Sequence, residues 1–255
     1  MTPRVWISGA SSGLGAALAR HYAAQGAHLG LTARHGERLR EVAATLPARA
    51  EIYPLDVTDA EAMRGAARDF IARAGLPDIV IANAGVSVGT LTEEADDLEA
   101  FARVMAVNVQ GAVNTFHPFV AAMRQRGSGR LAGIASVAGV RGLPGAGAYS
   151  ASKAALISYL ESLRVELRGS GVRVVTVAPG YIATPMTAVN KYPMPFMLPV
   201  DVAARRIARV IERGTSFAVV PWQMGVVARL MRLLPNGLFD ALAARSGRKP
   251  RGLKL

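Results

Sequence analysis

Three side chains in the middle of the sequence have the types and the spacing needed for proton transfer. Tyr149 and Lys153 are four residues apart in a segment of helical periodicity, so both side chains leave the same face. A free phenol has a pKa of about 10, and a nearby ammonium favours the phenolate and lowers that pKa. Ser136 ends an apolar run thirteen residues before Tyr149, where its hydroxyl is placed to hold a substrate oxygen.

This trio predicts a tyrosine that protonates the alkoxide formed when a carbonyl accepts hydride, or that takes the proton in the reverse reaction. Taken alone, a tyrosine and a lysine at this spacing are also found on the exposed face of an ordinary helix. The rest of the sequence is therefore needed to distinguish a proton-transfer site from an exposed helix face.

A glycine-rich turn near the N-terminus predicts a binding site for a dinucleotide phosphate. The apolar run Arg4–Ser8 leads into Gly-Ala-Ser-Ser-Gly-Leu-Gly, and a helical pattern starts at once. Glycines let the backbone approach a pyrophosphate, and the helix N-terminus offers unpaired N–H groups. The spacing differs from G-x-G-x-x-G, so by itself it also fits an ordinary strand-to-helix turn. The predicted contacts are Gly9, Ser11, Ser12, Gly13, Leu14 and Gly15, with the two serines able to cap the helix or bond a phosphate.

Short apolar runs alternate with longer helical stretches along the chain. The predicted strands are Arg4–Ser8, His28–Ala33, Glu51–Leu55, Asp78–Ala82, Arg130–Ala135, Val172–Ala178 and Phe217–Val220. The predicted helices cover residues 14–25, 36–45, 59–74, 93–107, 110–126, 149–168 and 200–213. This alternation predicts an α/β fold, a doubly wound parallel sheet with helices on both faces. We expect one domain over residues 1–255, with a loop at 181–199 and a helical extension from 222 onward outside the alternation.

Six motifs in this order resemble the short-chain dehydrogenase/reductase family over roughly residues 4–220. They are Gly9, Gly13 and Gly15; Asn83-Ala84-Gly85; Asn108; Ser136; Tyr149 with Lys153; and Pro179-Gly180 followed by Ile182 and Thr184. Ser8 stands where the family usually has Thr, and Ala82 where it more often has Asn.

The resemblance implies a nicotinamide-dependent oxidoreductase with a Rossmann-like sheet of seven parallel strands, assembled as a homodimer or homotetramer. It implies that Ser136, Tyr149 and Lys153 are catalytic, that Lys153 also bonds the nicotinamide ribose, and that Asn108 helps to hold a proton-relay water. The segments at 83–85 and 179–184 would contact the cofactor, and Asp56-Val57 resembles the pair that contacts the adenine.

The residues after the second strand indicate which cofactor is used. An NAD site usually has a carboxylate here that accepts bonds from the adenosine ribose, whereas this chain has Ala33 followed by Arg34. The guanidinium of Arg34 has the charge and shape to hold a 2′-phosphate, although an exposed loop arginine is the alternative. We expect NADP(H), with NAD(H) as the second choice.

Two segments bear on the substrate and on partners. The loop at 181–199 contains flexible and aromatic side chains that suit an apolar, lipid-like carbonyl or alcohol, or that pack within a structured lid: Met186, Tyr192, Met194, Phe196, Met197 and Leu198. The extension joins apolar helices to cations, namely Arg245, Arg248, Lys249, Arg251 and Lys254. That composition fits peripheral membrane contact, a cover for the substrate pocket, or a dimer contact with a solvated tail.

Composition removes several other classes of function. The chain has no cysteine, which excludes disulfides, thiolate metal sites and a cysteine nucleophile, and its four histidines do not cluster. The net charge of +12 can steer acidic partners, but no nucleic-acid motif accompanies it. We expect a cytoplasmic enzyme without a metal. The alternatives are a 3-oxoacyl-carrier-protein reductase and a non-catalytic NADP(H)-binding regulator, and the complete set of catalytic residues argues against the regulator.

Overall fold

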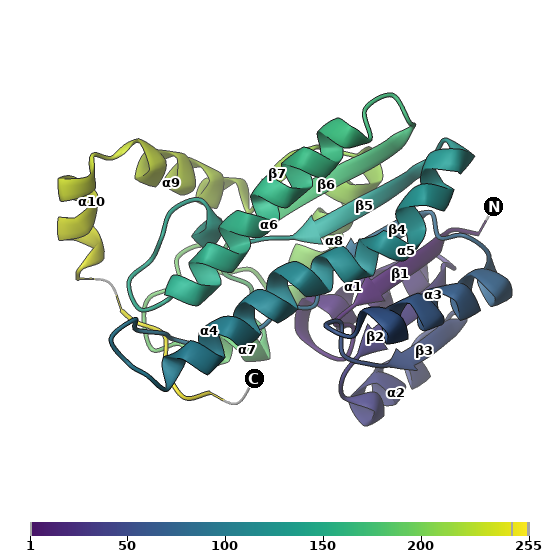
Figure 1. Ribbon diagram of the computed structural model, residues 1–255, viewed down its shortest axis with the longest axis horizontal. Helices are drawn as coiled ribbons and strands as arrows, with labels where there is room; N and C mark the ends of the chain where they lie inside the picture. Colours follow the sequence, from purple (N-terminus) through teal and green to yellow (C-terminus); the bar gives the residue numbers. More distant parts are fainter. Residues whose placement is uncertain (1, 246, 254–255) are drawn as a thin grey trace.

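The computed structural model describes residues 2–245 and 247–253, and in these residues seven parallel strands form one sheet with helices on both faces (Figure 1). The strands are β1 (Arg4–Ser8), β2 (His28–Ala33), β3 (Ala50–Pro54), β4 (Ile79–Ala82), β5 (Gly129–Ile134), β6 (Val172–Pro179) and β7 (Phe217–Val220). Their spatial order is β3-β2-β1-β4-β5-β6-β7. The predicted α/β fold class is confirmed, and each predicted strand lies within one residue of the observed bounds.

The helices are α1 (Gly13–Ala24), α2 (Gly36–Ala44), α3 (Ala60–Ala74), α4 (Asp97–Met105), α5 (Gly111–Arg126), α6 (Gly147–Glu166), α7 (Pro185–Ala188), α8 (Val200–Arg213), α9 (Trp222–Leu233) and α10 (Asn236–Ala243). A π-helical turn (Ala106–Gln110) lies between α4 and α5, and a 3₁₀ turn (Val137–Gly139) lies between β5 and α6. The π turn links α4 to α5 in one continuous helical run, whereas the sequence predicted two separate helices over 93–107 and 110–126.

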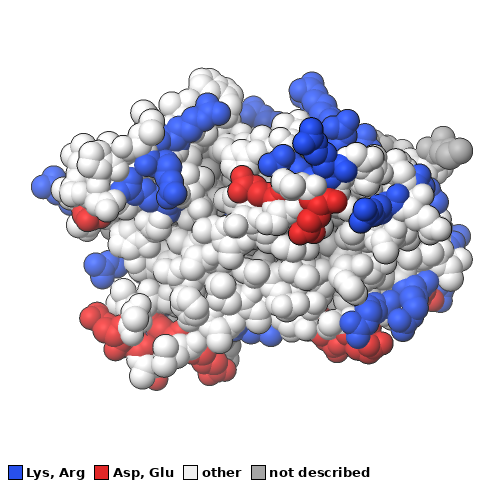
Figure 2. All heavy atoms as spheres, turned by 45° about the horizontal axis from the view of Figure 1, so that its top comes forward, with Lys and Arg blue, Asp and Glu red and all other residues white. Residues whose placement is uncertain are grey.

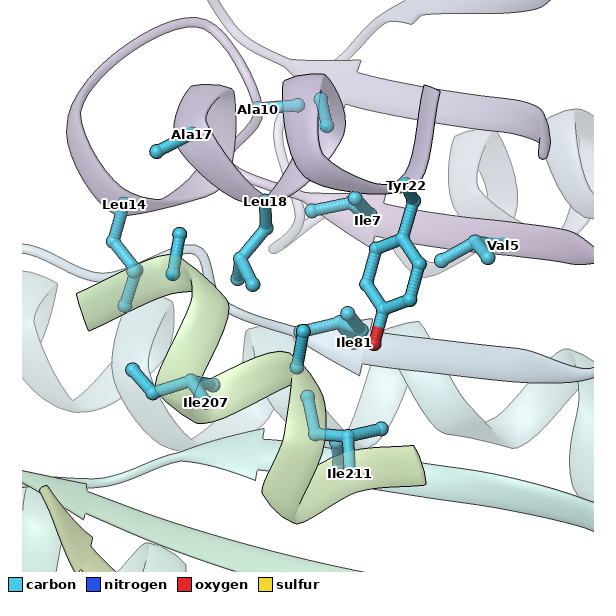
Figure 3. Packing of buried hydrophobic residues seen from close by; sticks show 14 of the residues in the cluster. Val5, Ile7, Ala10, Leu14, Ala17, Leu18, Tyr22, Ile81, Ile207 and Ile211 are labelled. Atoms are coloured by element: carbon cyan, nitrogen blue, oxygen red, sulfur yellow. The ribbon is translucent and has the colours of Figure 1, made fainter. Parts of the chain in front are cut away.

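The sheet has an apolar layer on each face because successive strand residues point to opposite sides. Val5 and Ile7 of β1 pack with α1, α2 and α8, while Trp6 between them packs with α3, α5 and α6. Figure 3 shows the first layer, where Leu18 of α1 points toward the helix α8 that carries Ile207 and Ile211. Each fully buried Leu or Ile contributes roughly 1.5–3 kcal/mol, so both layers hold the strand ends in fixed positions.

The C-terminal segment leaves the sheet after β7, and its last described residues return to the body of the protein. Helices α9 and α10 project from the body, and the chain beyond them runs back beneath α4 (Figure 1). The Gly89 amide donates to the Pro250 carbonyl (2.9 Å), and Arg251 pairs with Asp97 (2.7 Å). The ammonium of Lys249 donates to the Met186 carbonyl (3.2 Å).

Lys249 and Arg251 therefore do not belong to a freely solvated basic tail, which is one of the sequence-based expectations, because both side chains bond to groups of the protein. Lys254, counted in the same tail, lies outside the described residues. Within the described ranges, none of the helices combines the length and the apolar character required to cross a membrane.

Candidate active site

A cavity of about 360 Å³ lies at the carboxyl edge of the sheet, where β1 stands between β2 and β4. Ligands of open α/β sheets bind at such a position because the crossovers run in opposite directions from it. The structure brings almost all of the predicted site residues onto the wall of this cavity. They are Gly9, Ser11, Ser12, Gly13, Leu14, Gly15, Arg34, Asp56, Val57, Asn83, Ala84, Gly85, Ser136, Tyr149, Lys153, Pro179, Gly180, Ile182 and Thr184.

The glycine turn is held against the end of β4 by short contacts that exclude larger residues. Gly9 has a φ of +69°, and a Cβ there would lie 2.7 Å from the Ala84 Cα. A Cβ on Gly15 would lie 2.1 Å from the Gly9 carbonyl oxygen. The amide of Asn83 donates to the carbonyls of Ser8 (3.0 Å) and Gly9 (3.1 Å), which locks the two strand ends together. The backbone is thus fixed where α1 directs its N-terminus into the cavity.

Side-chain capping of α1, one of the two roles predicted for the serines of the turn, is not found at Ser12. Ser12 occupies the N-cap of α1 with extended backbone, but in the described structure its side chain makes no capping hydrogen bond. Both hydroxyls border the cavity, so the contact with a phosphate oxygen stays a prediction.

Ser136, Tyr149 and Lys153 come together although they belong to two separate elements. Ser136 follows β5, and its hydroxyl accepts a hydrogen bond from the Ala138 amide (3.1 Å). Tyr149 and Lys153 lie one turn apart in α6, with the Lys153 nitrogen 5.8 Å from the centre of the Tyr149 ring. The same ammonium donates to the Ile134 carbonyl (2.8 Å) at the end of β5. This bond joins α6 to the strand that carries Ser136.

Burial dominates the ionisation of these groups. It raises the pKa of Tyr149 above its usual 10, and the neighbouring Ser136 hydroxyl opposes the shift. It also lowers the pKa of Lys153 from 10.5 to about 8. The sequence predicted that the ammonium would lower the phenol pKa. In the protein without a cofactor the pKa of Tyr149 is raised instead, because both side chains are enclosed and the ammonium bonds a carbonyl rather than the phenol.

Asn108 lies behind the cavity wall, outside the described residues that line it. Its side-chain oxygen accepts from the Val86 amide (2.8 Å), and its nitrogen donates to the Val86 carbonyl (3.0 Å) and the Ser152 hydroxyl (2.9 Å). Ser152 in turn donates to the Tyr149 carbonyl (2.8 Å). The side chain therefore ties the loop after β4 to α6. The water-holding role implied by the resemblance stays a prediction.

The adenosine end of the cavity is cationic. Arg34 lines it as predicted, and so does Arg38, which sequence reasoning missed. Arg38 lies in the first turn of α2, and the fold brings that turn beside the cavity. Among the described lining residues Asp56 is the one carboxylate, and Arg103 pairs with it. Burial alone would raise its pKa, but hydrogen bonds from Thr58 and Arg103 hold the pKa of Asp56 below its usual value.

These residues fit a nicotinamide dinucleotide. The ends of β2 and β5 are three strand spacings apart, about 14 Å, which separates the cationic end from Tyr149. Between them lie the glycine turn and the N-terminus of α1, which suit a pyrophosphate.

The comparison with known proteins agrees with this geometry. A model of the short chain dehydrogenase family matches residues 3–193. The chain belongs to the short-chain dehydrogenase family. This dehydrogenase is thus an oxidoreductase of a family that uses nicotinamide cofactors.

Relatives of this dehydrogenase extend the match over nearly the whole chain. An uncharacterized oxidoreductase of Myxococcus xanthus (strain DK1622) is 41% identical over 242 residues, covering 94% of this chain and 95% of the relative. A solved short-chain dehydrogenase from Streptomyces avermitilis superposes with a TM-score of 0.78 and 28% identity, covering 96% of this chain and 95% of that one. An alcohol dehydrogenase from Thermococcus sibiricus, complexed with 5-hydroxy-NADP, shares the fold with a TM-score of 0.74 and 24% identity, covering 86% and 96%.

Proposed function

We propose that this dehydrogenase transfers hydride between NADP(H) and a carbonyl or secondary alcohol of an apolar, lipid-like substrate, with Tyr149 as the general acid and base. The observation that carries the proposal is the placement of Ser136, Tyr149 and Lys153 on the same cavity as the glycine turn. A binding module would need the turn alone. The proton-transfer groups become useful only when a reacting oxygen lies beside them.

The bound nicotinamide supplies hydride to the substrate carbon, or accepts it in the reverse direction. The Ser136 hydroxyl donates to the substrate oxygen and holds it near the phenol of Tyr149. In reduction, the phenol gives its proton to the alkoxide. Because burial raises the pKa of Tyr149, the phenol stays protonated near neutral pH and is ready to act as the acid. Lys153 holds its charge beside the ring and stabilises the phenolate that results.

Preference for NADP(H) rests on the charges at the adenosine end. Ala33 replaces the carboxylate that would repel a 2′-phosphate, while Arg34 and Arg38 both line the cavity. The guanidinium groups of Arg34, in the loop after β2, and of Arg38, in the first turn of α2, present several N–H donors to the phosphate oxygens. The carboxylate of Asp56 is bonded to Arg103 and Thr58, so its charge is offset.

The substrate loop, residues 181–199, supports an apolar substrate. Its base is closed by backbone bonds from Ala183 to Leu198 (2.9 Å) and from Leu198 to Tyr181 (3.0 Å). Within it, the rings of Tyr181 and Tyr192 meet edge to face, 6.3 Å apart. Burial, followed by the charges of Tyr181 and Tyr149, raises the pKa of Tyr192. Aromatic rings and the lining Met186 suit an alkyl or polycyclic group.

The test follows consumption of NADPH and of NADH with apolar ketones, long-chain 3-oxo esters and small polar carbonyls. The wild type is compared with Tyr149→Phe and with the matched control Tyr159→Phe, which lies in α6 outside the cavity lining of the described residues. We expect NADPH-dependent reduction of the apolar substrates, a loss of about 10²–10⁴-fold in Tyr149→Phe, and no comparable loss in the control. Retained turnover in Tyr149→Phe, or reduction of polar carbonyls alone, would contradict the proposal.

A further inference from the structure

A row of exposed apolar side chains covers the C-terminal arm, which we define as α9, α10 and the following residues to Arg245. On α9 the row follows intervals of four, four and three residues, so its members share one helical stripe. The row consists of Trp222, Val226, Leu230 and Leu233 on α9, and of Leu238 and Leu242 on α10. Trp222 is 69% exposed and Leu233 is 79% exposed, which is unusual for side chains of this size.

The opposite side of α9 packs against the body. Met224 and Ala228 are buried there with Val137, which follows the catalytic Ser136. Arg141 holds the elbow between the two helices, because its guanidinium donates to the Leu234 carbonyl (2.7 Å) and lies over the Phe239 ring. The row is thus fixed on a rigid support and faces away from the fold.

The charges of the arm are nearly all positive. Arg229, Arg232 and Arg245 are exposed, and Asp240 is the one acid between Trp222 and Arg245. At 100° per residue, Arg229 and Arg232 lie along one edge of the apolar stripe. Figure 2 shows basic side chains gathered beside uncharged surface at the left of the view, where the two helices project.

We infer that the C-terminal arm docks on an anionic phospholipid bilayer. The apolar row enters the boundary between headgroups and acyl chains, and Arg229 and Arg245 reach the lipid phosphates. Because Trp222 joins an apolar body to a polar N–H, it suits the interface itself. Contact through the arm takes the place of contact through the basic tail, whose Lys249 and Arg251 are bonded within the protein.

A second copy of the chain fits this surface less well. A two-fold contact brings the same patch of both copies together, so two surfaces that both carry a net positive charge would meet. A bilayer with anionic headgroups instead satisfies the apolar row and the arginines together.

The position of the arm gives the docking a use, and this step rests on the proposed function. Tyr181, at the base of the substrate loop, packs against the buried side of α9. The surface that meets the lipid therefore adjoins the segment that encloses the substrate. A lipid-like carbonyl compound could then pass from the bilayer to the cavity over a short distance.

Tryptophan fluorescence provides a direct test, because the two tryptophans differ completely in exposure. Trp6 is fully buried in the core, so a change of emission on adding vesicles reports on Trp222. The full chain is mixed with vesicles of phosphatidylcholine, or of phosphatidylcholine with phosphatidylglycerol, without cofactor or substrate. We expect cosedimentation with the anionic vesicles, a blue shift, and quenching by lipids brominated in the acyl chains. Trp222→Phe should keep the binding and lose the shift.

Variants of the row and of its arginines separate the two contributions. Leu230→Ser with Leu233→Ser should weaken partitioning by at least about 30-fold, because the two buried side chains together contribute more than about 2 kcal/mol. Arg229→Gln with Arg245→Gln should weaken binding to anionic vesicles by about 30-fold, at about 1 kcal/mol for each charge. The matched controls are Phe217→Ser at the start of β7, and Arg205→Gln with Arg209→Gln on α8. Both controls should bind like the wild type.

Three results would overturn the inference. They are no binding to anionic vesicles, binding that the arm variants leave unchanged, and a change of oligomer size in the leucine variant without vesicles, which would assign the surface to a second copy. The outcome is independent of the proposed function, since vesicle binding needs no turnover. Conversely, NADPH-dependent turnover of a water-soluble ketone should be the same in the arm variants and the wild type.

Discussion

Removal of the two arginines at the adenosine end tests the cofactor preference most directly. Arg34 follows β2 and Arg38 lies in the first turn of α2, and both line the cavity. A hydrogen bond to a charged group contributes about 1.5–3 kcal/mol when it is shielded from solvent. Since both side chains are exposed, screening reduces each contribution to about 1 kcal/mol. We therefore expect Arg34→Ala with Arg38→Ala to weaken NADPH binding by about 2 kcal/mol, or about 30-fold.

NADH has no 2′-phosphate, so its affinity should change much less. The measurement is a titration that follows the fluorescence of each reduced cofactor on binding, at low and at high salt. Salt should weaken NADPH binding to the wild type more than to the double variant, because it screens exposed charges. Ala33→Asp offers the reverse change, since a carboxylate at this position should favour NADH.

The matched control is Arg40→Ala, which removes an exposed arginine from the same helix but outside the described lining of the cavity. It should leave both affinities close to those of the wild type. Equal weakening of NADPH and NADH in the double variant would refute the reasoning, as would tighter binding of NADH by the wild type.

Three further changes test the geometry of the site. Gly15→Ala places a Cβ 2.1 Å from the Gly9 carbonyl oxygen, so we expect a destabilisation of about 1–3 kcal/mol in urea unfolding. A cofactor titration should also show weaker binding. Wild-type stability and affinity in this variant would contradict the close contact. For Lys153→Met, the free energy of unfolding of the variant is compared with that of the wild type between pH 8 and 10.5. In this range Lys153 is protonated in the unfolded chain and largely neutral in the folded protein. Wild-type stability should therefore rise by up to about 3 kcal/mol relative to the variant as the pH rises. The same pH dependence in both proteins would contradict this. Asn108→Ala leaves both backbone groups of Val86 without their partner and should cost about 2–3 kcal/mol in urea unfolding, whereas a loss below about 0.5 kcal/mol would rule out the tie.

The strands were predictable because most of their residues are apolar and face apolar layers on both sides of the sheet. Alternate residues such as Val5 and Trp6 both find an apolar layer, so a continuous apolar run bounded by turn residues marks a strand covered on both faces. The continuous run of α4 and α5 was not predictable in the same way. The π turn between them is held by a bond from Val86 to Asn108, twenty-two residues away, and no local pattern reports such a contact.

Residues at the edges of the site show a second limit of local patterns. Arg38 was missed because an arginine in a helix is usually a solvated residue, and only the fold places α2 beside the cavity. The cations of the tail were expected to be solvated because their partners lie far away in the sequence. Arg251 reaches Asp97 across 154 residues of sequence, a pairing that spacing along the chain cannot reveal.

The sequence by itself determined the order of the elements, the glycine turn, and the residue types and spacing that perform the chemistry. These features are local, because they depend on periodicity and on residues within one helical turn of each other. Tertiary structure alone decided the electrostatics. Burial reversed the expected shift in the pKa of Tyr149, and the Ile134 carbonyl, rather than the phenol, took the Lys153 hydrogen bond. Solvent exclusion and contacts between distant segments depend on the whole packed fold, so they could be read only from the structure.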